Sequence, residues 1–200
     1  MSNSIIVLIS GNGSNLQALI DAAKDSTLNA TITLVVSNKK SAYGLVRAAE
    51  AGIPTLVLTL KEYIDIGKSR VDYDIALAKK IKELNPDLLV LAGWMHILSK
   101  EFIDYFPEQI INLHPALPGQ FDGAHAIERA YEAFKRGEIT ETGVMVHKVI
   151  PEVDKGEPLL VERVPILESD TLEDLEARIH SVEHRLIVQA VIKFFKLVAF

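Results

Sequence analysis

Short apolar runs alternate with longer helix-like segments through the first half of the chain, and this alternation constrains the fold more than any other feature. The runs are rich in Ile, Val and Leu, as expected for strands buried on both faces of a mainly parallel sheet. They are Ile5–Ile9, Ile32–Val36, Thr55–Leu58 and Leu88–Leu91. The segments between them predict helices over Ser14–Lys24, Tyr43–Ala51 and Arg70–Leu84. Together they predict an α/β fold with a doubly wound, mainly parallel sheet.

The second half departs from this alternation. A short helix is predicted over Glu101–Tyr105, a fifth strand over Ile110–Leu113 that ends at His114, and a helix over Ala126–Arg136. Two strand-like runs, Thr142–Val149 and Pro158–Val164, are predicted to pair as an antiparallel extension. A long C-terminal helix then opens near Ser169–Thr171, with acidic residues in its first turn, and runs towards Phe200. We predict one domain over residues 1–200, because no linker divides the chain.

Composition narrows the class of protein. The net charge of −6 argues against a general nucleic-acid binder, which normally carries a basic face. No stretch approaches the roughly 20 apolar residues of a membrane helix, so we expect no membrane partner and a cytoplasmic protein. The chain has no cysteine, which excludes disulfides and thiolate chemistry. Its histidines and carboxylates follow no metal-ligand spacing, so we predict no metal.

A glycine-rich turn, residues 10–16, lies between the first strand and the first helix. Glycines expose backbone N–H groups there, and a helix N-terminus adds partial positive charge, so the turn predicts an anion site. A plain strand–helix turn capped by Ser or Asn is the alternative. A dinucleotide is disfavoured, because Leu16 replaces the third glycine and Ser37–Lys39 carries no acid after the second strand. A phosphate ester fits better.

Asn112 and His114 lie two residues apart at the end of the fifth predicted strand, so their side chains point to the same side. Both can donate hydrogen bonds to an oxyanion that forms as a carbonyl becomes tetrahedral. For this role His114 must hold a proton near neutral pH, which a carboxylate close by favours, and Asp154 is the best candidate. The alternatives are a structural histidine before Pro115 and a solvated turn around Glu152 and Asp154.

At these residues the chain resembles the phosphoribosylglycinamide formyltransferase family, folate-dependent enzymes of purine synthesis. The resemblance spans nearly the whole chain, and four segments in the same order and spacing carry it. They are Ile9–Gln17, Leu91–Met95, Ile111–Pro115 and Val153–Gly156. The resemblance implies a Rossmann-like formyltransferase fold. It also implies a phosphate- and ribotide-binding half over about residues 1–100, and a folate-binding and catalytic half over about residues 101–200.

The resemblance also implies roles for individual residues. Asn112, His114 and Asp154 would be catalytic. The substrate, glycinamide ribonucleotide, would be bound by Gly13, Ser14, Asn15, Leu16, Gln17, His180 and Glu183. The co-substrate, 10-formyltetrahydrofolate, would be bound by Arg70, Met95, His96, Ile97, Leu98, Asn112, Ile150, Pro151, Glu152, Val153 and Asp154. The partners would then be these small molecules, and the protein would be a monomer or homodimer.

Three places depart from the family pattern. His96 stands where bacterial members usually carry an arginine, the loop 118–123 differs, and His180 is not the commonest residue at its position. The expected reaction is attack of the substrate amine on the formyl carbon, with an alkaline decline in rate as His114 loses its proton. The alternatives are a formyltetrahydrofolate hydrolase, a formyltransferase acting on another amine, and a non-catalytic phosphate-binding module. The first two normally need an additional domain, for which we expect no room.

Overall fold

The protein is described by a computed structural model that covers residues 2–198. Its strands form a sheet with the order β3-β2-β1-β4-β5-β6-β7. The chain divides into two compact units, Met1–Ile111 and Asn112–Phe200, and the division falls within β5 (Ile110–His114). The predicted α/β class, with its mainly parallel sheet, is confirmed.

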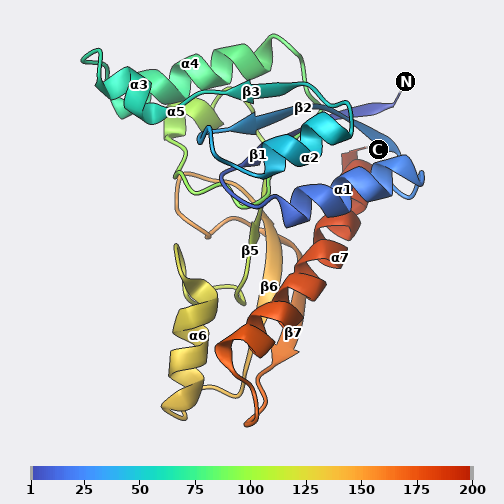
Figure 1. The fold of residues 1–200 in the computed structure, drawn as a ribbon, viewed down its shortest axis with the longest axis vertical. Helices are drawn as coiled ribbons and strands as arrows, with labels where there is room; N and C mark the ends of the chain where they lie inside the picture. Colours follow the sequence, from blue (N-terminus) through green and yellow to red (C-terminus); the bar gives the residue numbers. More distant parts are fainter. Residues whose placement is uncertain (1, 199–200) are drawn as a thin grey trace. The chain divides into compact units, whose positions relative to one another are not determined.

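The first unit alternates strands and helices. Its strands are β1 (Asn3–Ile9), β2 (Ala30–Ser37), β3 (Thr55–Val57) and β4 (Leu88–Leu91). Its helices are α1 (Ser14–Lys24), α2 (Gly44–Glu50), α3 (Leu60–Ile64), α4 (Arg70–Lys82) and α5 (Lys100–Ile103). The strands pair in parallel, β1 with β2 and β4, and β2 with β3. Helices α1 and α2 pack together, whereas α4 packs with α3 and α5 (Figure 1).

Burial explains why the strand pattern could be read from the sequence. All five residues of Ile5–Ile9 have no exposed surface, so β1 is covered on both faces. A strand covered on both faces needs consecutive apolar residues, which is the pattern seen in the sequence. The sharp start of α4 has a local cause, because Ser69 and Asp72 form a reciprocal capping box.

The second unit is built on an antiparallel pair of strands. It contains α6 (Ala126–Lys135), β6 (Glu141–Lys148), β7 (Pro158–Pro165) and α7 (Leu172–Val198). Strands β6 and β7 pair antiparallel, as predicted. The long helix α7 packs on both strands and on α6 (Figure 1). The predicted end of this helix at Phe200 lies outside the described residues.

One helix was not predicted. Helix α3 is only five residues long, too short for a helical period to be recognised in the sequence. Its start could have been inferred from Thr59, whose side chain accepts a hydrogen bond from the Glu62 N–H at 3.4 Å.

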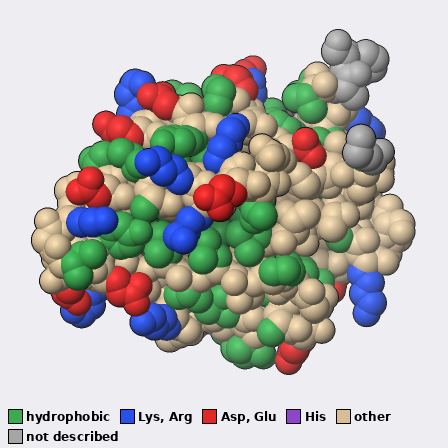
Figure 2. All heavy atoms as spheres, turned by 90° about the horizontal axis from the view of Figure 1, so that it is seen from above, with side chains coloured by type: hydrophobic (Ala, Val, Ile, Leu, Met, Phe, Trp, Pro, Cys, Tyr) green, Lys and Arg blue, Asp and Glu red, His purple; other side chains and the backbone are tan. Residues whose placement is uncertain are grey.

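The surface and the helices bear on the expected partners. In Figure 2, acidic and basic side chains alternate on the face in view, with hydrophobic side chains between them. This described face therefore presents no continuous basic stripe of the kind that nucleic-acid binders use. Within residues 2–198, no helix combines the length and the apolar character needed to cross a membrane.

An ion pair fixes the turn between β7 and α7. Asp170 accepts two hydrogen bonds from the Arg178 guanidinium, at 2.6 and 2.7 Å, and one from the Leu167 N–H at 2.8 Å. The Arg178 side chain also donates to the Pro165 carbonyl. The hydrogen bonds from Arg178 lower the pKa of Asp170 from 3.8 to about 2.

We predict that Asp170→Asn lowers the melting temperature at pH 7 because it removes this charged acceptor. The folded-state pKa lies below the unfolded one, so the stabilisation is present above pH 3.8 and is lost as the pH falls towards about 2. Thermal unfolding at several pH values should therefore show the variant and the wild type converging in that window. Glu173→Gln, which removes a charge from the exposed first turn of α7, should keep the wild-type pH dependence.

Candidate active site

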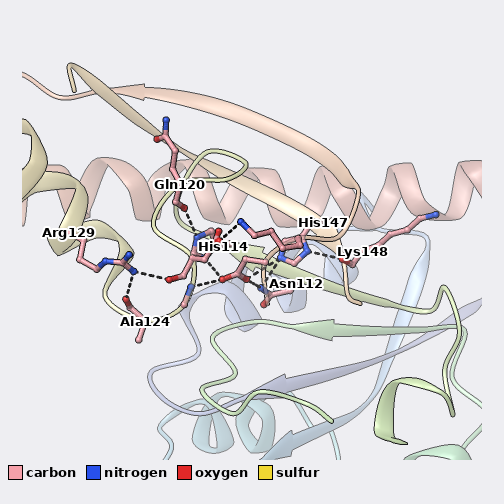
Figure 3. A network of polar contacts seen from close by, with 11 residues as sticks. Asn112, His114, Gln120, Ala124, Arg129, His147 and Lys148 are labelled. Atoms are coloured by element: carbon pink, nitrogen blue, oxygen red, sulfur yellow. Dashed lines mark hydrogen bonds and ion pairs between the residues drawn. The ribbon is translucent and has the colours of Figure 1, made fainter. Parts of the chain in front are cut away.

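Three polar side chains of the second unit converge on one carboxylate. Asn112 and His114 come from the end of β5 and His147 from β6 (Figure 3). The carboxylate is that of Asp154, in the loop between β6 and β7. Asp154 has a φ of 55°, a left-handed conformation that Asp tolerates better than most residues. The structure thus places Asp154 beside His114, as the sequence led us to expect.

Both carboxylate oxygens of Asp154 have polar partners. Oδ2 accepts a hydrogen bond from the Gly123 N–H at 2.7 Å and lies 3.4 Å from His114 Nδ1. Oδ1 accepts from Asn112 Nδ2 at 3.3 Å and lies 3.4 Å from His147 Nε2. Burial raises the pKa of Asp154, but the contacts with His147 and Gly123 outweigh it and leave the pKa below 3.8. The group is therefore a carboxylate at neutral pH.

His114 is almost fully buried and faces an acceptor on each side. Nδ1 faces Asp154, and Nε2 lies 3.4 Å from the Gln120 carbonyl oxygen. Two acceptors favour the doubly protonated ring, but burial opposes its charge. Burial is the larger effect and lowers the pKa of His114 below 6.5, although Asp154 acts in the opposite direction. The expectation that Asp154 keeps His114 protonated at neutral pH is therefore wrong for this structure.

We predict that the His114 ring titrates below pH 6.5 in a histidine NMR titration, because burial disfavours its charged form. Asp154→Asn should lower this pKa further, since it removes the charge that raises it. The unfolded state binds the proton more tightly, so His114 contributes stability above pH 6.5 that is lost as the pH falls through its folded-state pKa. A His114 pKa above 6.5 in the wild type would contradict the prediction.

His147 was missed by the sequence analysis. Its Nδ1 lies 2.8 Å from the Lys148 carbonyl oxygen, which only accepts, so Nδ1 carries the proton. In the neutral ring Nε2 then accepts from Asn112 Nδ2 at 3.1 Å. Both amide hydrogens of Asn112 are thereby used, one on His147 and one on Asp154. The available signal was a histidine directly after the apolar run Val144–Val146 of a buried strand.

The loop after β5 is held in an unusual backbone conformation next to His114. Phe121 and His125 have positive φ values of 50° and 58°. Arg129 of α6 donates to the backbone carbonyls of Asp122 and Ala124 (Figure 3). Its guanidinium lies 5.7 Å from the centre of the Phe121 ring. Such strain persists only where surrounding contacts enforce it, and it gathers at functional sites.

Three of these residues form a group that could hold a metal ion. Ligand atoms of His114, Asp122 and Asp154 lie within 4.8 Å of one another. The sequence spacing gave no indication of this group, because its members come from a strand and two separate loops. The Lys155 ammonium forms an ion pair with Asp122, and a cation bound there would have to displace it. Our expectation of no metal stays a prediction.

Gly156 meets the backbone of β6 with no space for a side chain. A Cβ atom at this position would lie 1.6 Å from the Lys148 carbonyl oxygen, the same atom that fixes His147. The Lys148 N–H also donates to the Glu157 carbonyl at 2.9 Å, which holds the two segments together.

Gly156→Ala should therefore move the Lys148 carbonyl and disturb His147. We expect a loss of about 1–3 kcal/mol in the free energy of unfolding, the usual range for overpacking a tight site. Urea denaturation would measure the loss, and the His147 ring resonances should shift. An unchanged unfolding free energy with unshifted resonances would contradict the prediction.

The glycine-rich turn in the first unit is shaped by a close backbone approach. Gly13 is the N-cap of α1, with a φ of 75° and no side-chain cap. A Cβ atom on Gly13 would lie 2.6 Å from Gly44 Cα, so both the conformation and the space require glycine. The simple alternative of a Ser or Asn cap is therefore not what the structure contains. The first-turn N–H groups of α1 receive no cap from this residue, which suits an anion.

The predicted substrate residues in this turn have different surroundings. Ser14 and Gln17 are half-buried, whereas Asn15 and Leu16 are buried. The Gln17 amide nitrogen donates to Asp21 Oδ1 at 2.9 Å, so part of this side chain already has a partner in the protein.

Residues 95–98 expose two apolar side chains and bury a third. Met95 and Ile97 are exposed, and Leu98 is buried. His96 turns inward, where Nε2 lies 2.7 Å from the fully buried Asp74 carboxylate. Arg70 donates to the Ile97 carbonyl oxygen. The His96 side chain thus contacts the protein, and the folate role predicted for this segment would rest on its backbone groups.

The remaining predicted residues lie in the second unit. Ile150, Pro151 and Glu152 are exposed and Val153 is half-buried, in the loop that also carries Asp154. On α7, Glu183 is buried and His180 is exposed. Their binding roles stay predictions.

Comparison with known proteins identifies the class. Residues 3–191 match the formyl transferase family, and the chain belongs to this family. It is 55% identical to phosphoribosylglycinamide formyltransferase of Schizosaccharomyces pombe, with 96% of each chain covered. It is 53% identical to the protein of the same name from Dictyostelium discoideum, covering 96% of this chain and 97% of that protein.

The fold agrees with solved structures of similar proteins. The crystal structure of phosphoribosylglycinamide formyltransferase from Campylobacter jejuni superposes with a TM-score of 0.88 at 37% identity, and the match covers 98% of both chains. A glycinamide ribonucleotide transformylase from Symbiobacterium toebii gives a TM-score of 0.87 at 38% identity, covering 94% of this chain and 85% of that one.

Proposed function

We propose that this chain transfers the formyl group of 10-formyltetrahydrofolate to the amine of 5′-phosphoribosylglycinamide, the third step of de novo purine synthesis. The observation that carries the proposal is the network of Asn112, His114 and Asp154 at the end of β5. The near-complete match to relatives named for this activity supports the choice of substrate.

The reaction needs one new bond, one broken bond and one proton transfer. The substrate amine attacks the formyl carbon, and the carbonyl oxygen becomes an oxyanion. The amine loses a proton, the bond from the formyl carbon to the folate nitrogen breaks, and that nitrogen gains a proton. We propose that His114 and Asn112 stabilise the oxyanion, and that His114 and Asp154 assist the proton transfer.

The protonation state of His114 suits both parts of this role. Its lowered pKa leaves the resting ring neutral and able to accept a proton from the amine. Once charged, the ring is stabilised by Asp154, by the Gln120 carbonyl and by the oxyanion. It can then return the proton to the leaving nitrogen, directly or through water.

Asn112 must release a hydrogen bond in order to stabilise the oxyanion. Both of its amide hydrogens already have acceptors. The bond to Asp154, at 3.3 Å, is longer than the usual 2.9–3.0 Å or so for an N–H···O bond, and we propose that this hydrogen turns to the oxyanion.

Two buried acceptors near His114 are available to a ligand that donates. Asp122 Oδ1 and Gln120 Oε1 are buried and accept no hydrogen bond from the described residues. Buried acceptors are normally satisfied, and a substrate amine carries N–H donors of the required kind. These two residues were not among the sites predicted from sequence.

The proposal keeps the binding roles expected from the resemblance. The glycine-rich turn with Gln17, His180 and Glu183 would bind the ribotide. Arg70, residues 95–98 and residues 150–154 would bind the folate, with the exposed Met95 and Ile97 offering apolar surface. The proposal includes action on these small molecules in the cytoplasm, with neither a nucleic acid nor a membrane as partner.

We expect His114→Ala and Asp154→Asn each to lower the single-turnover rate by about 100- to 1000-fold, the usual cost of losing one group that stabilises an oxyanion. Folate affinity should change far less. Rapid-quench measurements with both substrates, together with fluorescence titration of the folate, test this. Near-normal rates in both variants would refute the assignment.

Formate release separates this reaction from hydrolysis. The wild type should consume 10-formyltetrahydrofolate only when glycinamide ribonucleotide is present, and the product should carry the formyl group. Formate release that is independent of the ribotide would identify a hydrolase.

A further inference from the structure

Arg47, on α2, contacts the glycine-rich turn through three hydrogen bonds. Its Nε and one terminal nitrogen donate to the backbone carbonyl and to Oδ1 of Asn12, both at 2.9 Å. Its other terminal nitrogen donates to Gln17 Oε1 at 3.3 Å. One guanidinium thus ties together residues on both sides of Gly13, the N-cap of α1.

The packing of α2 fixes the position of this guanidinium. The Gly44 N–H donates to the Gly11 carbonyl at 3.1 Å. A Cβ atom on Gly44 would lie 2.3 Å from Ile9 Cδ1 and 3.3 Å from Gly13 Cα, so the start of α2 lies close against the turn. The Arg47 guanidinium also lies 5.0 Å from the centre of the Tyr43 ring, which limits its movement.

Among residues 2–198, no negative charge neutralises that of Arg47. Its hydrogen-bond acceptors are a backbone carbonyl and two side-chain amides, and no carboxylate among residues 2–198 forms an ion pair with it. The side chain is half-buried, so its charge is screened less than that of a fully exposed arginine. It adds to the partial positive charge of the α1 N-terminus, and together they favour an anion.

We infer that Arg47 is a positioning residue for a phosphate monoester bound at the glycine-rich turn. It holds Asn12 and Gln17 so that the turn keeps its shape, and it supplies a positive charge close to a group that carries about −1.5 to −2 at neutral pH. This inference rests on the proposed function, because that function places the ribotide phosphate at this turn.

A purely architectural role for Arg47 makes a different prediction. If it only ties α2 to the turn, its loss lowers stability and affects all substrates equally. If it acts on the phosphate, its loss affects only substrates that carry one. Comparing glycinamide ribonucleotide with glycinamide ribonucleoside, the same molecule without its phosphate, separates the two roles.

The test uses the full chain with Arg47→Met and Arg47→Lys. For Arg47→Met we expect kcat/KM for the ribonucleotide to fall about tenfold or more, through KM, a change of about 1.4 kcal/mol per factor of ten. The kcat/KM for the ribonucleoside and the KM for the folate should stay within about twofold of the wild-type values. Arg47→Lys keeps the charge but loses the planar guanidinium, so its KM for the ribonucleotide should lie between those of the wild type and Arg47→Met. Arg136→Met, which removes an exposed guanidinium paired with Glu138, is the matched control.

An equal fall for ribonucleotide and ribonucleoside, or no fall for either, would overturn the inference. Arg47→Lys decides the matter on the same criteria if Arg47→Met does not fold. A calorimetric titration with ribose 5-phosphate keeps the inference testable if the wild type transfers no formyl group to the ribotide. In that case the proposed function fails. Tighter binding of ribose 5-phosphate to the wild type than to Arg47→Met would still support the role of Arg47, whereas equal binding would overturn that role as well.

Discussion

The site in the second unit depends on a single buried carboxylate. A carboxylate can stay ionised away from water only if donors surround it. Asp154 accepts hydrogen bonds from Gly123 and Asn112, and the rings of His114 and His147 lie 3.4 Å from its two oxygens. These residues come from a strand end, a second strand and two loops. The requirement to solvate one charge therefore explains why distant segments of the chain converge, and it fixes the orientation of the Asn112 amide. The same requirement brings the strained loop after β5 to the side of His114.

His114 illustrates how two physical effects compete within one site. Its two neighbouring acceptors favour the charged ring, whereas its burial favours the neutral one, and burial is the larger effect. A ring in this balance changes state when a negative charge forms beside it. In the proposed mechanism the resting ring would act as a base. The negative charge that develops on the oxyanion would favour the protonated ring, which could then act as an acid. Sequence reasoning recognised the acceptor but had no means of weighing burial against it.

Much of the fold followed from local patterns, and the parts that did not are those that depend on distant contacts. Buried strands such as Ile5–Ile9 can be recognised in the sequence because both of their faces are apolar. The predicted boundaries of α1 agree with the structure to the residue. The five-residue helix α3 has no periodicity to detect. The residues carried over from the family resemblance included Asp154, but not His147 or Arg47. His147 and Arg47 matter because of the atoms that they contact in the folded protein, and no spacing in the sequence indicates those contacts.

Gly156 also limits where this chain can change in length. Because its backbone touches the Lys148 carbonyl directly, the two ends of the connection between β6 and β7 are locked in register. Added residues cannot be absorbed at that end without sliding one strand past the other. Pro151 and Glu152, at the exposed tip, have no such constraint. Insertions that preserve the pairing of β6 with β7 should therefore be confined to the tip, which is also the segment we assign to the folate, so a change in length there would act on the proposed folate site and leave the sheet intact.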